Sequence, residues 1–248
     1  TAKITSQHGL VYHKLIKDMG EDLARQYAEA NEKAIKEIQQ IIDNHNIDCD
    51  YLPQAAYIYS QDDKYLKDIE NEVDAAKSLG IEASFVEEIP LDIDIKAGVK
   101  FDNQAQFHPR KFLLPLADLV QKSGVSIYEE TRVLAMEEDD DSGHYILSTS
   151  QAHKVRAKKV IIASHYPFYN KASMYFARLY VERSYILAVK TREKFPGGIY
   201  INAEDPPRSL RSLETEDGQL VLVVGDKHKT GQGEDTHTHY KNLFDFAQ

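Results

Sequence analysis

The chain has 248 residues, of which 42% are hydrophobic and 28% charged, and its formal net charge is −10 at pH 7. Such a composition is typical of a soluble globular protein with one large or two modest domains, and it argues against nucleic acid or an anionic membrane as the main partner. Cys49 is the only cysteine, which excludes an internal disulfide and a cysteine-rich metal site. No apolar run approaches the roughly 20 residues that span a bilayer, and no signal peptide is visible, so we expect a soluble, cytoplasmic protein.

The first hundred residues predict helices and strands without a regular alternation. Residues 1–9 are polar and turn-like. Apolar residues recur every three to four positions in 20–46 and 62–79, which predicts two amphipathic helices. Runs rich in aromatic and β-branched residues predict strands at 51–60, 81–88 and 93–101. This order favours an α+β unit.

The rest of the chain changes character near residue 167. A helix is predicted over 106–118, where Pro109 suits the first turn, and strands follow at 125–137 and 145–149. Beyond that point the pattern becomes antiparallel. Strands are predicted at 178–190, 198–202, 208–213 and 219–224, followed by a charged loop at 226–234 and a helix from 236.

One more strand is predicted at 160–164. Val160, Ile161 and Ile162 are apolar, as in strands that are covered on both faces, and the run ends at Ala163 and Ser164. Small residues at the carboxyl end of such a strand leave space for a ligand to approach the backbone. Alternatively, they only let a helix pack closely.

We therefore predict an α/β fold combined with an α+β fold, in two interleaved domains. Segments 1–46 and 106–168 would form the α/β domain. Segments 47–105 and 169–248 would form a mostly antiparallel domain. A chain that crosses twice between two domains creates a cleft, which is a usual place for ligands.

Several catalytic motifs are missing from the sequence. No Gly-x-Gly-x-x-Gly occurs, and Gly231-Gln232-Gly233 lacks the third glycine. No nucleophile elbow and no Ser-His-Asp arrangement stands out. His237 and His239 have a spacing that could bind a metal, but no third ligand is apparent, so we predict no metal site.

Cationic side chains gather in the antiparallel part of this acidic chain. The planar fork of arginine suits carboxylates because it donates two parallel hydrogen bonds. The alternative is ordinary surface charge on turns. The cationic residues are Arg208, Arg211, Lys227, His228 and Lys229.

Four ordered stretches resemble the flavin-dependent amine and amino-acid oxidoreductases of the D-amino-acid-oxidase superfamily. They are most similar to the bacterial branch whose members often carry a C-terminal Rieske [2Fe–2S] domain. The similarity extends along essentially the whole chain. The stretches are TAKITSQHG at 1–9, QFHPRKFLLPLA at 106–117, VIIASHYPF at 160–168, and SLRS with VGDKHKTGQ within 209–232.

This resemblance implies that 1–46 and 106–168 form part of a Rossmann-type FAD domain. Segments 47–105 and 169–248 would then form a substrate domain over the flavin ring. The resemblance also implies a role for particular residues. The cofactor side would comprise Thr1, Ala2, Lys3, Ile4, Thr5, Val133, Ala163, Ser164 and His165. The substrate side would comprise Arg208, Arg211, His228 and Lys229.

The departure from the family is large. Its glycine-rich N-terminal unit would precede Thr1, and its closing segment would follow Gln248. Because those glycines let the backbone approach the pyrophosphate, we expect this piece alone to bind FAD weakly or not at all and to be inactive. The loss of the first strand should also leave strands 125–135 and 160–164 without their usual neighbour.

For the intact protein, the resemblance implies oxidation of the C–N bond of an amine or amino acid by hydride transfer to FAD. A [2Fe–2S] cluster would lie in a domain outside this chain. The competing hypothesis is a module without cofactor that is derived from the same fold and binds a small ligand or a protein.

Overall fold

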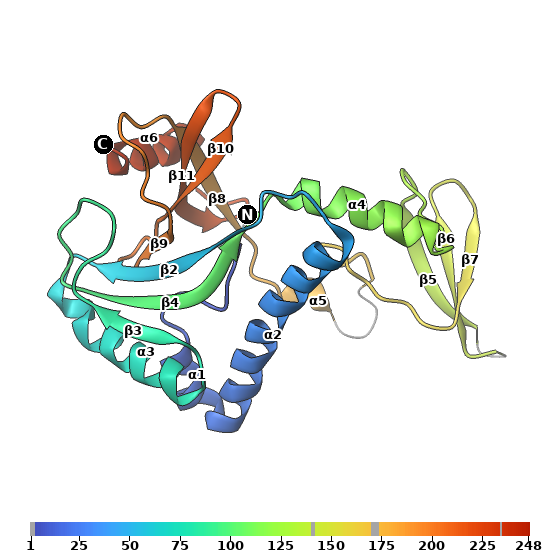
Figure 1. Cartoon of the computed structure of the whole chain (residues 1–248). Helices are drawn as coiled ribbons and strands as arrows, with labels where there is room; N and C mark the ends of the chain where they lie inside the picture. The colour runs from blue at the N-terminus through green and yellow to red at the C-terminus, as the bar shows by residue number, and fades with distance from the viewer. Residues whose placement is uncertain (1–2, 140–141, 170–173, 234) are drawn as a thin grey trace. The chain divides into compact units, whose positions relative to one another are not determined.

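The computed structural model describes residues 3–139, 142–169, 174–233 and 235–248 (Figure 1). The chain divides into two compact units, Thr1–Ala117 with Glu182–Gln248, and Asp118–Val181. These boundaries differ from the predicted grouping of 1–46 with 106–168, because residues 3–46 belong to the same unit as the antiparallel sheet. The functional division into an FAD part and a substrate part stays a prediction. No helix within the described ranges is both long and apolar enough to cross a membrane.

The first unit is built on an eight-stranded sheet. Its order is β1-β4-β2-β9-β10-β11-β8, and β3 pairs with β4 as well. Every pairing is antiparallel except that of β2 with β9. The strands are β1 (Lys3–Ile4), β2 (Leu52–Ser60), β3 (Ala83–Val86), β4 (Ala97–Gln106), β8 (Glu182–Val189), β9 (Ile199–Asn202), β10 (Ser209–Thr215) and β11 (Gly218–Lys229).

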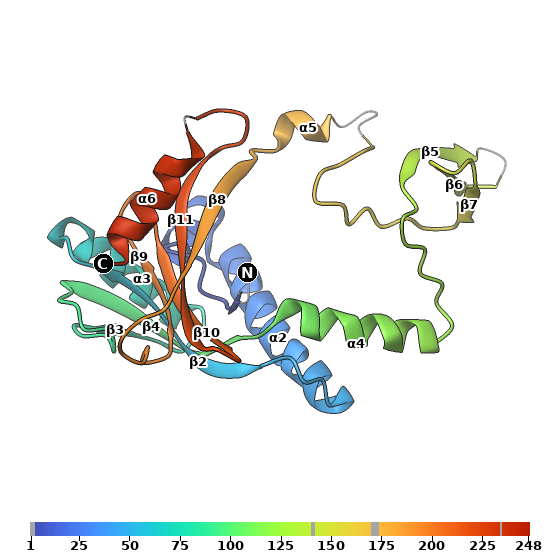
Figure 2. The same cartoon turned by 90° about the horizontal axis from the view of Figure 1, so that it is seen from above.

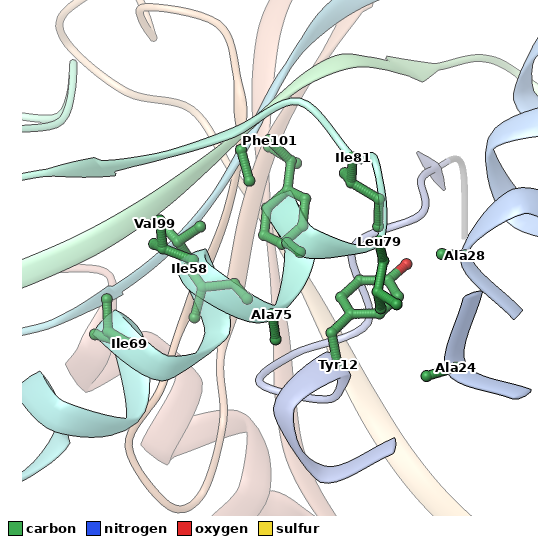
Figure 3. Packing of buried hydrophobic residues seen from close by; sticks show 14 of the residues in the cluster. Tyr12, Ala24, Ala28, Ile58, Ile69, Ala75, Leu79, Ile81, Val99 and Phe101 are labelled. Atoms are coloured by element: carbon green, nitrogen blue, oxygen red, sulfur yellow. The ribbon is translucent and has the colours of Figure 1, made fainter. Parts of the chain in front are cut away.

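Three helices cover one face of this sheet on the side of β2, β3 and β4. They are α1 (Tyr12–Met19), α2 (Glu21–His45) and α3 (Leu66–Ser78), and a short 3-10 helix, η1 (Asp63–Tyr65), precedes α3. Figure 3 shows the resulting core, in which Ile58 and Phe101 of the sheet meet Tyr12 of α1. All three side chains are at most 1% exposed. Burial of this face accounts for the amphipathic patterns of 20–46 and 62–79, and both predicted helices are confirmed.

Another helix belongs to the C-terminal part of the unit. Helix α6 (Thr236–Phe246) lies beside β11 and β8, as Figures 1 and 2 show. Its Leu243 is fully buried against Tyr185 and Val223. The predicted loop at 226–234 is partly wrong, because β11 continues through a bulge to Lys229.

The second unit holds a three-stranded antiparallel sheet in the order β5-β6-β7. Helix α4 (Pro109–Lys122) leads into the unit, and the short α5 (Tyr175–Arg178) lies near its end. The strands are β5 (Val133–Asp139), β6 (His144–Thr149) and β7 (Lys154–Ala157). The strand predicted from 125 begins only at Val133.

The strand predicted at 160–164 is wrong for this chain. Residues 160–164 have no regular secondary structure, and Ile161 is 91% exposed. A strand forms when a neighbour satisfies its backbone N–H and C=O groups, and no strand of the described residues pairs with this segment. Its apolar pattern alone therefore does not make it a strand.

Candidate functional site

One face of the β8–β11–β10 region is left open. Directly opposite residues of antiparallel strands share a face, so the pairing places Ile186 beside Val224. The next row contains Ala188, Leu222 and Arg211. Ile186 is 48% exposed, and Ala188 is exposed too. We call these five residues the open face; it is a mostly apolar surface with one cation at its edge.

Arg211 and Lys3 form a pair of cations beside this surface. Lys3 lies opposite Gln106 in the β1–β4 pairing, and Arg211 is only 6% exposed. Burial, and then repulsion from Arg211, lower the pKa of Lys3 to about 8, and burial lowers the pKa of the Arg211 guanidinium. The Nε of Arg211 is buried without a hydrogen-bond partner. Within the described part of the chain, neither cation has an ion-pair partner.

A chain of amide side chains ties the strand of Arg211 to the rest of the sheet. Gln54 Nε2 donates to Gln106 Oε1 at 2.8 Å, and Gln106 Nε2 donates to the Ser212 carbonyl at 3.0 Å. Gln54 Oε1 accepts from the Gly198 N–H at 2.9 Å. These bonds bridge β10 to β4 and β2 next to the start of the short strand β9. The bridge holds Arg211 on the side of the sheet where Lys3 enters.

A groove gives access to this cluster. It has a volume of about 780 Å³, and Arg211 and Gln106 are part of its wall. Leu52 and Leu213 supply apolar surface, and Lys111 adds a cation that is already paired with Asp50 at 2.7 Å. The groove wall also carries the carboxylates of Asp50, Glu214 and Glu216, so its charges are of both signs, and Lys3 is not one of its lining residues.

A second cavity of about 450 Å³ lies near the start of α1. Ile58 and Ile201 are among its apolar lining residues, and His8, Glu72 and Lys227 are among its polar ones. The Glu72 carboxylate already accepts hydrogen bonds from three backbone N–H groups at the start of α1. Because its charges are of both signs, this cavity indicates no particular ligand.

The structure divides the predicted substrate-side residues between two places. Arg211 lies on the open face. Arg208 instead places its guanidinium carbon 5.1 Å from the centre of the Phe246 ring of α6. His228 stacks on His239 of α6, with ring centres 4.7 Å apart. Lys229 ends β11 opposite Glu182.

The predicted cofactor-side residues near the N-terminus have different environments. Thr1 and Ala2 lie outside the described residues. Ile4 is buried against Ile35 of α2, and Thr5 Oγ1 donates to the Gln7 carbonyl at 3.1 Å. Lys3 is the residue of this stretch that contributes a charge to the cluster.

The remaining predicted residues belong to the second unit. Val133 opens β5 and pairs with Thr149. Ala163, Ser164 and His165 are exposed and have no regular secondary structure. Their contacts with a cofactor stay a prediction.

Sequence reasoning missed Gln106 and the pair of Asp226 and His239. His239 Nδ1 lies 2.8 Å from Asp226 Oδ2, and Asp226 is 7% exposed. A strand that ends on a glutamine carries no signal that the amide is buried. Among the described residues, no group of three or more His, Cys, Asp or Glu side chains is arranged to hold a metal ion.

Comparison with known proteins places these features in context. Residues 4–248 match the family described as DAO, FAD dependent oxidoreductase. YhfW of Bacillus subtilis (strain 168), which carries the provisional name of a Rieske 2Fe-2S iron-sulfur protein, is 37% identical over 248 residues. The match covers 100% of this chain and 48% of YhfW, so the chain spans about half of that relative.

Solved structures with the same fold share little sequence with this chain. The glycine oxidase of Geobacillus kaustophilus has a TM-score of 0.65 at 15% identity, covering 100% of this chain and 65% of that one. The FAD-bound L-alpha-glycerophosphate oxidase of Mycoplasma pneumoniae has a TM-score of 0.68 at 15% identity, covering 99% and 66%. These likenesses confirm the predicted fold class.

Proposed function

This chain belongs to the DAO family of FAD-dependent oxidoreductases, and we propose that the protein containing it oxidises the C–N bond of an amine or amino acid. The observation that carries the proposal is the family match over residues 4–248 together with the open face beside Lys3 and Arg211. The similar glycine oxidase acts on an amino acid, whereas the similar glycerophosphate oxidase acts on a phosphate ester of an alcohol. The substrate class is therefore inferred from the site rather than from the fold.

The residues of this chain fit the flavin ring of FAD better than its pyrophosphate. The open face is mostly apolar, which suits a flavin ring. The 248 residues contain no Gly-x-Gly-x-x-Gly to cradle the pyrophosphate. We accordingly propose that this chain alone binds FAD weakly and that the parts of the longer protein complete the site.

When bound, the flavin supplies the acceptor for the hydride that leaves the carbon next to nitrogen. The role of this chain is to bind and orient. Arg211 and Lys3 attract an acidic group of the substrate, and the apolar residues of the open face exclude water. Two nearby cations also favour the neutral form of a bound amine over the ammonium form. Because a neutral amine needs no base to remove its proton, we assign no general base.

The test is to express the full-length protein and record its absorption spectrum. We expect yellow protein whose flavin bands bleach when an amino acid or amine is added without oxygen. Arg211→Leu should raise KM for acidic substrates about 10- to 100-fold, since a charged hydrogen bond contributes about 1.5–3 kcal/mol. Lys111→Met is the matched control, because Lys111 lines the same groove but is paired with Asp50. Colourless full-length protein would exclude the proposal.

A second redox centre is also proposed, on the provisional Rieske name of YhfW. The [2Fe–2S] cluster would be held by a part of the protein outside these residues and would receive electrons from the flavin. Iron and acid-labile sulfide analysis of the full-length protein should find about two of each per chain. Absence of both would exclude a cluster while leaving the flavin proposal intact.

The alternative function is a cofactor-less module that binds a small ligand or a protein. The observation in its favour is that these residues contain no glycine-rich cradle for the pyrophosphate. The same spectrum decides between the two functions, because a module of this kind would be purified without flavin.

A further inference from the structure

Two histidines meet where helix α6 lies on the sheet. His228 of β11 and His239 of α6 have nearly parallel rings whose centres are 4.7 Å apart. The ring of Tyr185 on β8 contacts both, with centres 4.6 Å from His239 and 5.7 Å from His228. We call these three residues the ring cluster. It joins the first turn of α6 to two strands, whereas Leu243 attaches the helix farther along.

The two histidines have unequal polar surroundings. His239 Nδ1 lies 2.8 Å from Oδ2 of the buried Asp226, which also accepts from Asn242 at 3.1 Å. His228 Nδ1 is buried, and among the described residues it has no hydrogen-bond partner. A neutral histidine carries one N–H, whereas a protonated histidine carries two. In its protonated form His228 therefore has a buried donor without an acceptor, which costs free energy.

The charged groups around His228 do not favour a second proton on the pair. Across the β8–β11 pairing, Arg183 lies directly opposite His228 and adds a cation. Glu182 of the same strand is bonded to Lys227 at 2.9 Å. The uncharged Gly233 packs on the ring, since an added Cβ would lie 3.1 Å from Cδ2 of His228. The remaining titratable groups of these strands and of α6 with its cap are Lys229, Asp235, His237, Tyr240, Lys241 and Asp245.

One carboxylate thus serves two histidine rings. In the part of the chain that the structure describes, Asp226 is bonded to His239, and no second carboxylate bonds to either ring. With one proton on the pair, the charge of His239 is offset by Asp226. With two protons, like charges lie on rings 4.7 Å apart and repel each other. Because one ring belongs to the sheet and the other to α6, this repulsion acts directly against the attachment of the helix.

We propose that the ring cluster is a pH-sensitive clasp for α6, which holds the helix while His228 is neutral and releases it when both histidines are protonated. The proton comes from solvent and forms an N–H bond on His228, and no other covalent bond is made or broken. Release uncovers Tyr185 and Val223, on which Leu243 packs in the attached state. The inference is independent of the proposed function, because it concerns only the attachment of one helix.

The direction of the pH dependence follows from counting protons in the two states. In the attached state, the second proton on the pair is disfavoured. In the released state His228 is hydrated, and a histidine in water is half protonated near about pH 6.5. The released state therefore binds more protons as the pH falls, and linkage shifts the equilibrium toward it. Between about pH 7 and about pH 5, the released fraction should rise about tenfold.

The experiment is hydrogen exchange of the full-length protein at about pH 7 and about pH 5, read by mass spectrometry on peptides from α6. Each rate is compared with that of an unstructured peptide at the same pH, which removes the intrinsic effect of pH on exchange. We expect the protection of α6 amides to fall about tenfold, while α3 keeps its protection. Unchanged protection of α6, or an equal fall in α3, would overturn the proposal.

Three variants test the two rings separately. His228→Phe keeps a flat ring but cannot be protonated, so α6 should keep its protection at about pH 5. His239→Phe removes one of the two charges and should lessen the fall, and it decides the question if the larger ring at position 228 prevents attachment at about pH 7. His237→Gln is the matched control, because His237 is an exposed histidine of the same helix and should leave the tenfold fall in place. A full fall in an attached phenylalanine variant, or its loss in His237→Gln, would refute the clasp.

Discussion

The carboxylate of Glu72 on α3 accepts the backbone N–H of Tyr12 on α1 at 2.9 Å, and both side chains are fully buried. The same carboxylate accepts the N–H groups of Val11 at 2.8 Å and His13 at 3.0 Å. Helix α1 has no side-chain cap of its own at its first turn. One buried acid on α3 thus caps the neighbouring helix and joins it to the core.

Replacement of Glu72 should destabilise the first unit. In Glu72→Gln, one carboxylate oxygen becomes an NH₂ group, which leaves a backbone N–H of α1 facing another donor. We expect a loss of about 1–3 kcal/mol in the free energy of unfolding, measured by urea denaturation. Glu70→Gln removes only a surface ion pair with Lys67 and should cost under about 1 kcal/mol. Equal effects of the two changes would contradict the capping role.

Lys3 should make the free energy of unfolding depend on pH in the alkaline range. Its pKa is lowered to about 8 from 10.5, so the unfolded chain holds this proton more strongly than the folded chain. The free energy of unfolding should therefore rise with pH between these two values. Lys3→Met should remove this rise, as measured by urea denaturation at several pH values. A Lys3→Met variant with an unchanged slope would show that other groups cause it.

Gly98 on β4 has no space for a methyl group. An added Cβ would lie 3.0 Å from Val86 Cγ2 and 3.1 Å from the Ile58 carbonyl oxygen. Gly98→Ala should lower the free energy of unfolding by about 1–3 kcal/mol because the strands must move apart. Ser84→Ala on the adjacent strand β3 is a control that should change it by less than about 0.5 kcal/mol. Thermal or urea unfolding measures both variants.

Asp226 should hold the start of α6 in place. Its Oδ2 accepts from His239 at 2.8 Å and from Asn242 at 3.1 Å. Asp226→Asn keeps the shape of the side chain but removes its charge. Asparagine also tolerates the φ of 52° at this position. We expect α6 amides to exchange with solvent about tenfold faster, equivalent to about 1.4 kcal/mol. Asp245→Asn, an exposed position on the same helix, should leave exchange unchanged.

Leu243 should contribute most of the apolar attachment of α6. It is 0% exposed and packs against Tyr185 and Val223. Leu243→Ala should cost about 2–5 kcal/mol through lost burial and the cavity that remains. Phe244→Ala, at a position that is 50% exposed, should cost much less even though it removes a larger side chain. A reversed order would mean that α6 binds the sheet through its other face.

Local patterns predicted most helices and strands. The exceptions depend on partners that are remote in sequence. The helices over 20–46 and 62–79 follow from apolar residues at spacings that one buried face requires. Residues 160–164 carry an equally good strand pattern and form no strand, because a strand depends on a neighbour that local sequence does not contain. Helix α1 was missed because its N-terminal cap is Glu72, which is remote in sequence.

The sequence alone identified the family, since four ordered stretches carry the resemblance and the match extends over residues 4–248. It also selected Lys3 and Arg211 as candidates, but on opposite sides of a predicted site. Only the tertiary structure brought them together, because β1 joins the far end of β4 and the Gln54–Gln106 bridge holds β10 beside it. Side-chain type and periodicity are local properties, whereas the proximity of two charges depends on how distant strands pair.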